Sequence, residues 1–257
     1  MNIFSKSLLS SKCTLTVVTT PVDATCTLTS DGVQYVTKSL TVKKGSTIFY
    51  SIYHPTYGTT SGAVNMSSGK TLTCIGISSP GFVDVSFSQP ALSANGTLGG
   101  SSFAVYASKE QSTGYALWKA FDKNTSTCWS AGAGANTTNF NGTYFTIYNP
   151  AALKVSSLSI TNRSGVNGYT PKNGTVYGSD NNSSWTSIAT YSNSDSTAGS
   201  VWTLSVGSSN YYKYYKIVVS EILPYNNIYY SIQLAEIGVN GVYQSSTTTY
   251  SWNTTIT

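Results

Sequence analysis

The sequence predicts an all-β protein built from two β-sandwich domains. Apolar and polar residues alternate over many short segments, which is the pattern of half-buried strands. Clusters of Gly, Asn, Asp and Ser separate these segments and are typical of tight turns. Apolar residues at helical spacing are convincing in one stretch only, between Gly114 and Asp122.

The first domain is predicted to cover residues 12–79, after an N-terminal arm at residues 1–11. Turn signals at Asp31-Gly32, at residues 43–45 and at residues 67–70 divide it into short strands. The expected strands are Cys13–Val18, Ala24–Thr29, Val36–Val42, Thr47–Tyr53, Ala63–Met66 and Leu72–Ile77. Six or seven strands in about 65 residues are typical of a small β-sandwich.

A Ser-Ser-Pro-Gly segment at residues 78–81 predicts a break after the first domain. We expect residues 80–87 to form a linker that runs into a first strand, and residues 88–243 to form a larger β-sandwich or jelly roll. The expected strands of that domain are Tyr144–Tyr148, Val155–Thr161, Gly174–Ser179, Trp185–Tyr191, Val201–Val206, Tyr212–Ser220 and Leu234–Val239. Residues 244–257 are rich in Ser and Thr and are predicted to be a C-terminal tail.

The charged fraction of the chain is 9%, whereas about 25% is usual. Arg163 is the only arginine and His54 the only histidine. A nucleic-acid surface needs many clustered cations, and Ser-His or Cys-His catalysis needs an available histidine, so neither is expected. Glycoside hydrolysis needs two facing carboxylates, and none of the nine acidic residues has such a context. We therefore expect no enzyme, and no membrane insertion because no apolar run reaches 18 residues.

The four cysteines show no CxxC spacing, so a zinc site is not expected. The segment Met1–Lys12 lacks the basic and apolar regions of a secretory signal. Without export, buried free thiols are favoured over disulfides. If a bridge forms, Cys13 and Cys74 are the candidates, because they lie in the first and last strands of the first domain.

An ordered set of motifs marks the first domain. A Thr-Pro-Val-Asp-Ala-Thr segment at residues 20–25 precedes Asp31-Gly32, a Val-Lys-Lys-Gly segment at residues 42–45 and Tyr57-Gly58. This order resembles a PEGA-type β-sandwich repeat over about 65 residues. The resemblance implies an accessory spacer without chemistry of its own.

Four motifs in the second domain occur in the order of a known family. They are Ala116–Trp129 (ALWKAFDKNTSTCW), residues 169–185 with Tyr-Thr-Pro-Lys and Gly-Ser-Asp-Asn-Asn-Ser-Ser-Trp, residues 214–217 (YYKI) and residues 234–237 (LAEI). The domain resembles a discoidin, or coagulation-factor 5/8 type C, domain, a family with many carbohydrate-binding modules. The resemblance implies a jelly roll. Lys123 and Asn182 stand where the family prefers Gly in tight turns with positive φ.

The resemblance also implies a structural calcium ion in the loop after the helical segment. Calcium binds six to eight oxygens. The residues expected to supply them are Asp122, Asn124, Thr127 and Glu236. The alternative is that Asp122 caps the loop through backbone N–H groups, while Thr127 and Glu236 pair locally.

Sugar recognition in such a sandwich uses loops at one end, here residues 108–115, 130–142, 163–169 and 224–230. An aromatic ring stacks on the apolar face of a sugar, and Asn, Arg or Glu side chains bind its hydroxyls. The expected glycan-binding residues are Glu110, Tyr115, Phe140, Arg163, Tyr169, Tyr225, Asn226, Asn227 and Tyr229.

The whole pattern resembles surface proteins of tailed-phage virions. We expect a non-enzymatic structural protein, a capsid decoration or tail adhesin, assembled in the bacterial cytoplasm and placed on the virion surface. Its partners would be other virion proteins or its own copies, through the arm and tail, and cell-surface or mucin glycans. Two alternatives remain open: a carbohydrate-binding accessory module of a bacterial surface protein, and a protein–protein joint that binds no sugar.

Overall fold

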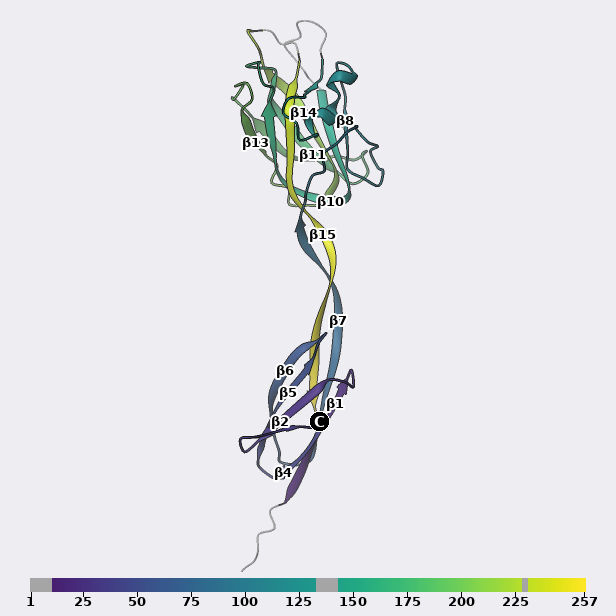
Figure 1. The fold of residues 1–257 in the computed structure, drawn as a ribbon, viewed down its shortest axis with the longest axis vertical. Coiled ribbons are helices and arrows are strands. Elements are labelled where there is room, and N and C mark those ends of the chain that lie inside the picture. The colour runs from purple at the N-terminus through teal and green to yellow at the C-terminus, as the bar shows by residue number, and fades with distance from the viewer. Residues whose placement is uncertain (1–10, 133–142, 228–230) are drawn as a thin grey trace, which may run out of the picture. The chain divides into compact units, whose positions relative to one another are not determined.

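The computed structural model describes residues 11–132, 143–227 and 231–257. It confirms the all-β class with two β-sandwich units. One unit contains the chain up to Phe82 together with Ser246–Thr257, and the other is Val83–Ser245 (Figure 1). Among the described residues, no helix has the length and apolarity needed to span a bilayer.

The first unit contains two sheets with a shared core. One sheet has the order β15-β7-β1-β4 and the other the order β3-β2-β5-β6. Strand β1 runs parallel to β7 and antiparallel to β4. The bounds are β1 (Lys12–Thr20), β2 (Thr25–Ser30), β3 (Val33–Val36), β4 (Ser39–Lys43), β5 (Thr47–His54), β6 (Gly58–Asn65), β7 (Lys70–Ser86) and β15 (Gln233–Ile256).

Alternation fixes which face of each strand enters this core. In β5, Ile48, Tyr50 and Ile52 are buried while Phe49 and Tyr53 are exposed. Successive side chains of a strand point to opposite faces, so the strand predicted at Thr47–Tyr53 is confirmed, and the fold decides which of its apolar faces is buried. The core of the first unit comprises buried side chains from both sheets: Leu15, Val17, Cys26, Leu28, Ile48, Ile52, Val64, Met66, Leu72 and Cys74.

Residues 244–257, predicted to be a tail, instead belong to strand β15. The backbone N–H groups of Thr71 and Thr257 each donate to the other's carbonyl, at 2.8 and 2.9 Å. Trp252 packs against the core of the first unit, and its Nε1 donates to the Gly58 carbonyl at 3.1 Å. Backbone pairing and two rings, Tyr250 and Trp252, which both contact Tyr57, therefore anchor this segment, and neither feature produces an apolar alternation in the sequence.

The segment at residues 78–81, predicted to separate the domains, does not interrupt the strand, because β7 runs from Lys70 to Ser86, although the two units divide close by, between Phe82 and Val83. The pairing of β7 with β1 ends at Ile75, so β7 has a free edge beyond that residue. Proline has no N–H to donate and is tolerated in strands at such an edge. Pro80 therefore does not terminate the strand.

All four cysteines are buried free thiols. Cys74 is the ladder partner of Thr19, six residues along β1 from Cys13. At about 3.3 Å per residue the two cysteines are about 20 Å apart, whereas a disulfide needs Cα atoms within about 7 Å. The Cys13–Cys74 bridge considered above is therefore wrong.

In the second unit, the long strand β10 belongs to two layers. Its first part, Thr143–Tyr148, pairs with β8 and β14, and β14 pairs with β11. Its second part, Ser157–Thr161, pairs with β13 and β15, after a register irregularity between Tyr148 and Leu153. The bounds are β8 (Ala104–Ala107), β9 (Trp129–Ser130), β10 (Thr143–Asn162), β11 (Thr170–Ser179), β12 (Thr186–Ser192), β13 (Val201–Ser205) and β14 (Tyr212–Leu223).

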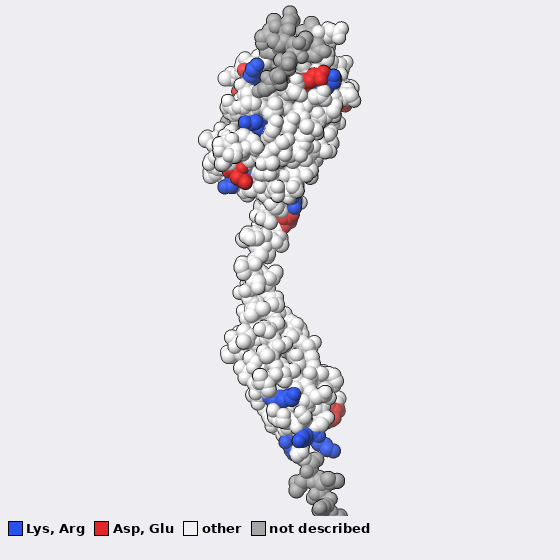
Figure 2. All heavy atoms as spheres, turned by 180° about the vertical axis from the view of Figure 1, so that it is seen from behind, with Lys and Arg blue, Asp and Glu red and all other residues white. Residues whose placement is uncertain are grey.

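The core of this unit lies between the two layers. It includes the fully buried Trp129, Phe145, Leu117 and Phe121. The helical segment predicted near residues 114–122 forms two 3-10 helices, η1 (Thr113–Tyr115) and η2 (Leu117–Ala120). Few charged side chains appear on the surface in Figure 2, as the 9% charged fraction requires.

Candidate functional site

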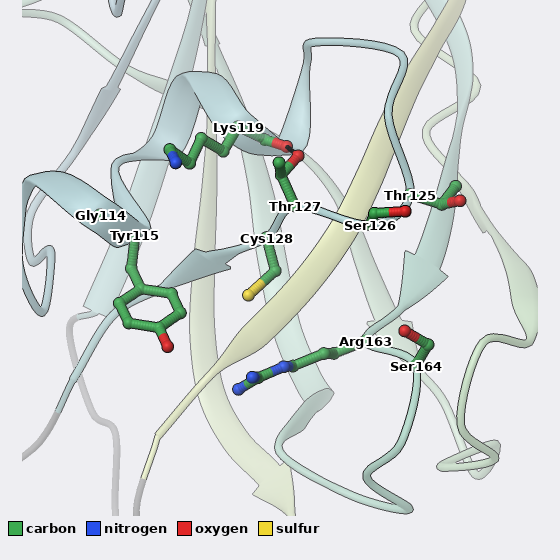
Figure 3. Close-up of a pocket in the computed structure, with 9 residues that line it drawn as sticks. All are labelled: Gly114, Tyr115, Lys119, Thr125, Ser126, Thr127, Cys128, Arg163 and Ser164. Atoms are coloured by element: carbon green, nitrogen blue, oxygen red, sulfur yellow. Dashed lines mark hydrogen bonds between the residues drawn. The ribbon is translucent and has the colours of Figure 1, made fainter.

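A pocket of about 410 Å³ opens among loops of the second unit (Figure 3). Helix η1 supplies one wall, the loop after η2 supplies a second, and the chain that follows β10 supplies the third. The lining residues are Gly114, Tyr115, Lys119, Thr125, Ser126, Thr127, Cys128, Arg163 and Ser164. Two predicted glycan-binding residues, Tyr115 and Arg163, therefore lie in one pocket.

Arg163 is held in place by two neighbours. Its Nη1 donates a hydrogen bond to Oε1 of Gln233 at 2.8 Å, and its guanidinium carbon lies 5.8 Å from the centre of the Tyr115 ring. Gln233 is buried, and its backbone N–H donates to the Tyr169 carbonyl at 2.7 Å. Gln233 thus connects the pocket to the loop that carries Tyr169.

Tyr169 forms an aromatic pair with Tyr225. The ring centres are 5.8 Å apart and the planes are inclined by 54°. The two loops meet at Gly168, which has a φ of +145°, and a Cβ there would lie 2.4 Å from the Pro224 carbonyl oxygen. Only glycine allows this approach, so the backbone fixes the pair. The Tyr225 residue is 37% exposed.

Asn226 and Asn227, beside this pair, are exposed and have φ angles of 48° and 61°. Asparagine adopts the left-handed region more readily than most residues, which accounts for this residue type at the loop tip. Their amides are available to a ligand that stacks on Tyr225. Phe140 and Tyr229, also predicted for this site, lie outside the described residues.

Glu110 does not line the pocket. Its Oε1 accepts hydrogen bonds from the Leu117 backbone N–H at 2.7 Å and from Asn95 Nδ2 at 2.9 Å. These bonds fix the start of η2, which is a structural role. Residue type alone does not favour this role, because an exposed acid in a loop is equally suited to bind a sugar hydroxyl.

The pocket also contains residues that the sequence did not single out. Cys128 lies beside Arg163, and burial raises the pKa of its thiol, although Arg163 and Lys119 lower it. Gln233, which orients Arg163, lies in a strand that reads as core. Residue type alone does not place Cys128 or Gln233 near this site, because the position of each beside Arg163 depends on contacts between distant parts of the chain.

The predicted calcium loop brings several oxygens together. Thr127 Oγ1 lies 2.7 Å from Asp122 Oδ2, 2.8 Å from the Asn124 carbonyl and 3.2 Å from the Lys119 carbonyl. A hydroxyl has one proton to donate, so it cannot satisfy all three acceptors at once. The Asn124 carbonyl also accepts the Thr127 backbone N–H at 3.1 Å, so the group is an oxygen-rich cluster in which Asp122 Oδ2 and the Lys119 carbonyl share one hydroxyl proton.

Glu236 adds a buried carboxylate to this cluster. The pKa of Glu236 is raised from 4.5 to about 7, because burial and the negative charge of Asp122 raise it by more than the backbone N–H groups of Lys123, Asn124 and Ile237 lower it. Its Oε2 is buried without a hydrogen-bond partner in the described structure. An unpaired buried acceptor beside a second carboxylate is what a hard cation neutralises. The residues present thus fit a calcium ion.

The alternative capping arrangement is present as well. Asp122 Oδ1 accepts the Asn124 backbone N–H at 2.9 Å. One carboxylate oxygen thus closes the loop while the other faces the cluster. Lys119 was not among the predicted ligands, since a backbone carbonyl carries no residue-type signal. The described residues contain no group of three His, Cys, Asp or Glu side chains placed to hold a metal ion, so carbonyl oxygens would complete this site.

The loop after Asp122 adopts the conformation expected at the position where the family prefers Gly. Lys123 has a φ of 60°, and Asn182 in the second such turn has a φ of 59°. Lys123 is exposed, and it lines a shallow pocket together with Glu236.

No protein-family model matches the sequence, and no curated protein matches it. The chain is similar to solved β-sandwich modules over about half its length. The family 32 CBM from Clostridium perfringens NanJ, solved in complex with galactose, shares 22% identity over 55% of this chain and 93% of its own, with a TM-score of 0.42. A CBM32 module from the same organism, in complex with GalNAc-β-1,3-galactose, shares 17% identity over 55% and 94%, with a TM-score of 0.43. An F5/8 type C domain from Bacteroides fragilis shares 15% identity over 56% and 92%, with a TM-score of 0.43.

Proposed function

We propose that the chain is a non-enzymatic glycan-binding protein whose loops in the second unit bind a neutral sugar. The observation that carries this proposal is the continuous group formed by Tyr115, Arg163, Gln233, Tyr169 and Tyr225. It joins an orienting cation to an aromatic pair whose outer ring, Tyr225, is exposed, and these are two features that sugar recognition uses.

The chemistry of each part follows from its contacts. Arg163 uses one nitrogen to bind Gln233, and its remaining N–H groups are donors for sugar hydroxyls. Tyr225 presents an exposed ring on which the apolar face of a pyranose can stack, and the amides of Asn226 and Asn227 lie beside it. The pocket contributes hydroxyl groups from Thr125, Ser126 and Ser164.

The test is a glycan array probed with the intact chain and three variants. Arg163→Ala should weaken binding by about tenfold or more, because a hydrogen bond to a charged group contributes about 1.5–3 kcal/mol. Tyr225→Ala should also weaken binding, because it removes the ring on which the sugar stacks. Tyr53→Ala, which removes an exposed ring from the first unit, is the matched control and should bind normally. Unchanged binding by both site variants would refute the proposed site.

We also propose that calcium occupies the oxygen cluster around Thr127 and is structural. Thr127 belongs both to this cluster and to the pocket wall, so the ion would fix one side of the sugar site without touching the sugar. Calcium should raise the melting temperature of the intact chain, whereas magnesium, which prefers a smaller octahedral site, should do so far less. Identical melting curves in calcium and in EDTA would contradict this proposal.

The biological setting remains a prediction of the sequence. A virion protein should appear in mass spectra of purified virions, whereas an accessory module of a bacterial surface protein should not. A glycan array without any binding by the folded chain would favour the third possibility, a protein–protein joint.

A further inference from the structure

A second group of aromatic residues lies on a sheet face of the second unit, away from the loop site. Adjacent strands β8, β10 and β14 place Tyr106, Thr146 and Lys216 in one row, because Thr146 is the ladder partner of both other residues. Their neighbours in β10 and β14, Phe145 and Ile217, are core residues. Since side chains alternate between faces, the row lies on the outer face of the sheet.

This face is hollowed rather than flat. A pocket of about 320 Å³ is lined by Leu98, Tyr106, Tyr144, Thr146, Asn182 and Lys216. Tyr106 is 46% exposed, and its ring centre lies 6.2 Å from that of Tyr144. Ligand pockets range from roughly 300 to 1,000 Å³, so this one has room for a single small ring.

Lys216 supplies the only positive charge among the residues that line the pocket. Its Nζ lies 4.6 Å from the centre of the Tyr144 ring and 4.0 Å from the centre of the Trp185 ring. These rings hold the ammonium group in place. Within the described part of the chain it has no ion pair, and partial burial lowers its pKa.

We propose that this pocket is a second saccharide site, which binds a sugar carrying a carboxylate or sulfate group. The exposed Tyr106 ring stacks on the pyranose, and the Lys216 ammonium binds the anionic group. Asn182, at the rim, provides an amide for a hydroxyl.

The charge pattern favours an acidic sugar over a neutral one. A lysine that already contacts two aromatic faces retains three N–H donors without a carboxylate acceptor, and partial burial strengthens its attraction to an anion. An apolar partner would leave those donors without an acceptor. The preference is opposite to that of the loop site, where an arginine bound to an amide meets hydroxyl groups.

The experiment measures binding of three probes to the intact chain by isothermal titration calorimetry and ligand-observed NMR. The probes are glucuronic acid, galactose 6-sulfate and galactose. Lys216→Gln and Tyr106→Ala should each weaken binding of at least one acidic probe by about tenfold or more, and Lys216→Arg should retain it. Because Tyr106 is exposed, Tyr106→Ala keeps the test valid if Lys216→Gln unfolds the domain.

The two sites can be tested independently, because each has a variant that should affect only that site. Arg163→Ala should leave binding of the acidic probe unchanged, and Tyr106→Ala should leave binding at the loop site unchanged. Failure of the loop proposal therefore does not affect this one. The inference is overturned if the acidic probes do not bind the Arg163→Ala variant better than galactose does at millimolar concentration, if both face variants bind the acidic probes normally, or if a short poly-aspartate peptide competes as well as the sugars.

Discussion

The oxygen cluster in the second unit makes the effect of Glu236→Gln depend on calcium. Without calcium, the wild-type chain buries a carboxylate near Asp122 with one oxygen unpaired. Glutamine removes the charge, keeps an oxygen for the backbone N–H groups of Lys123 and Asn124, and adds an NH₂ donor for neighbouring oxygens. With calcium, the same substitution removes a ligand. The variant should therefore be more stable than the wild type in EDTA and less stable in excess calcium.

The magnitudes follow from the pKa and from mass action. The folded chain raises the pKa of Glu236 from 4.5 to about 7. Ionisation of Glu236 therefore lowers the free energy of unfolding. This loss is absent below pH 4.5, grows as pH rises from 4.5 through 7 and is complete at pH 8. It amounts to about 3 kcal/mol at most. Calcium at one hundred times its dissociation constant stabilises the wild type by about 2.7 kcal/mol. One kcal/mol corresponds to about 2–4 °C for a domain of this size, so each difference should reach several degrees.

Differential scanning calorimetry at pH 8, in EDTA and in calcium, measures both differences on the intact chain. Glu221→Gln is the control, since it removes an exposed acid paired with Lys172 at 2.6 Å and should respond to calcium as the wild type does. A variant that is less stable than the wild type in both buffers would refute the reasoning. Equal stabilisation of both proteins by calcium would do so too.

Three further predictions concern stability and reactivity. Trp252→Ala should destabilise the first unit by about 2 kcal/mol through lost packing and a lost hydrogen bond, which calorimetry would show as a lower transition for that unit and an unchanged one for the second. At pH 8 the four thiols of the folded chain should resist a thiol-specific dye, because all four are buried and burial also raises the pKa of Cys74 to about 11. All four should react in denaturant. Rapid labelling of the folded chain would contradict the buried positions. Lys123→Gly should raise the melting temperature in calcium by a few degrees. Lys123 has a φ of 60°, and a lysine in the left-handed backbone region costs about 1 kcal/mol. A lower melting temperature would show that the Lys123 side chain makes a contact that stabilises the fold by more than this strain.

Alternation in the sequence was sufficient to predict most strands, because it reports directly which face is buried. It failed where backbone pairing alone decides the structure. The Ser- and Thr-rich residues after Tyr243 form part of β15 through ladder bonds and Trp252, and Pro80 lies inside β7 because one edge of that strand is free. Two predicted strands, Tyr144–Tyr148 and Val155–Thr161, proved to be parts of one strand, β10. Between them the chain crosses from one layer to the other without leaving the strand.

In the candidate sites, too, some residues could be suggested from the sequence and others became visible only in the fold. Residue type was enough to suggest Arg163, Tyr169 and Tyr225, since few other side chains can bind and orient a sugar. Residue type also suggested Glu110, whose carboxylate in the structure accepts a hydrogen bond at the start of η2 and does not line the pocket. It could not find Gln233 or the Lys119 carbonyl, because an amide in a core strand and a backbone oxygen acquire a role only through their neighbours in space. The row of Tyr106 and Lys216 depends on strand register, which a single sequence does not specify.

The low charge of the chain has a different consequence at each proposed site. At the loop site, Arg163 is bound to the neutral amide of Gln233, and its partners in a neutral sugar are hydroxyl groups. Salt screens interactions between charges, so binding there should change little with ionic strength. At the sheet face, the half-buried Lys216 would attract a full negative charge, and that binding should weaken as salt increases. In a chain with a charged fraction of only 9%, few other charges contribute to either dependence, so a salt titration of each probe reports which of the two sites holds it.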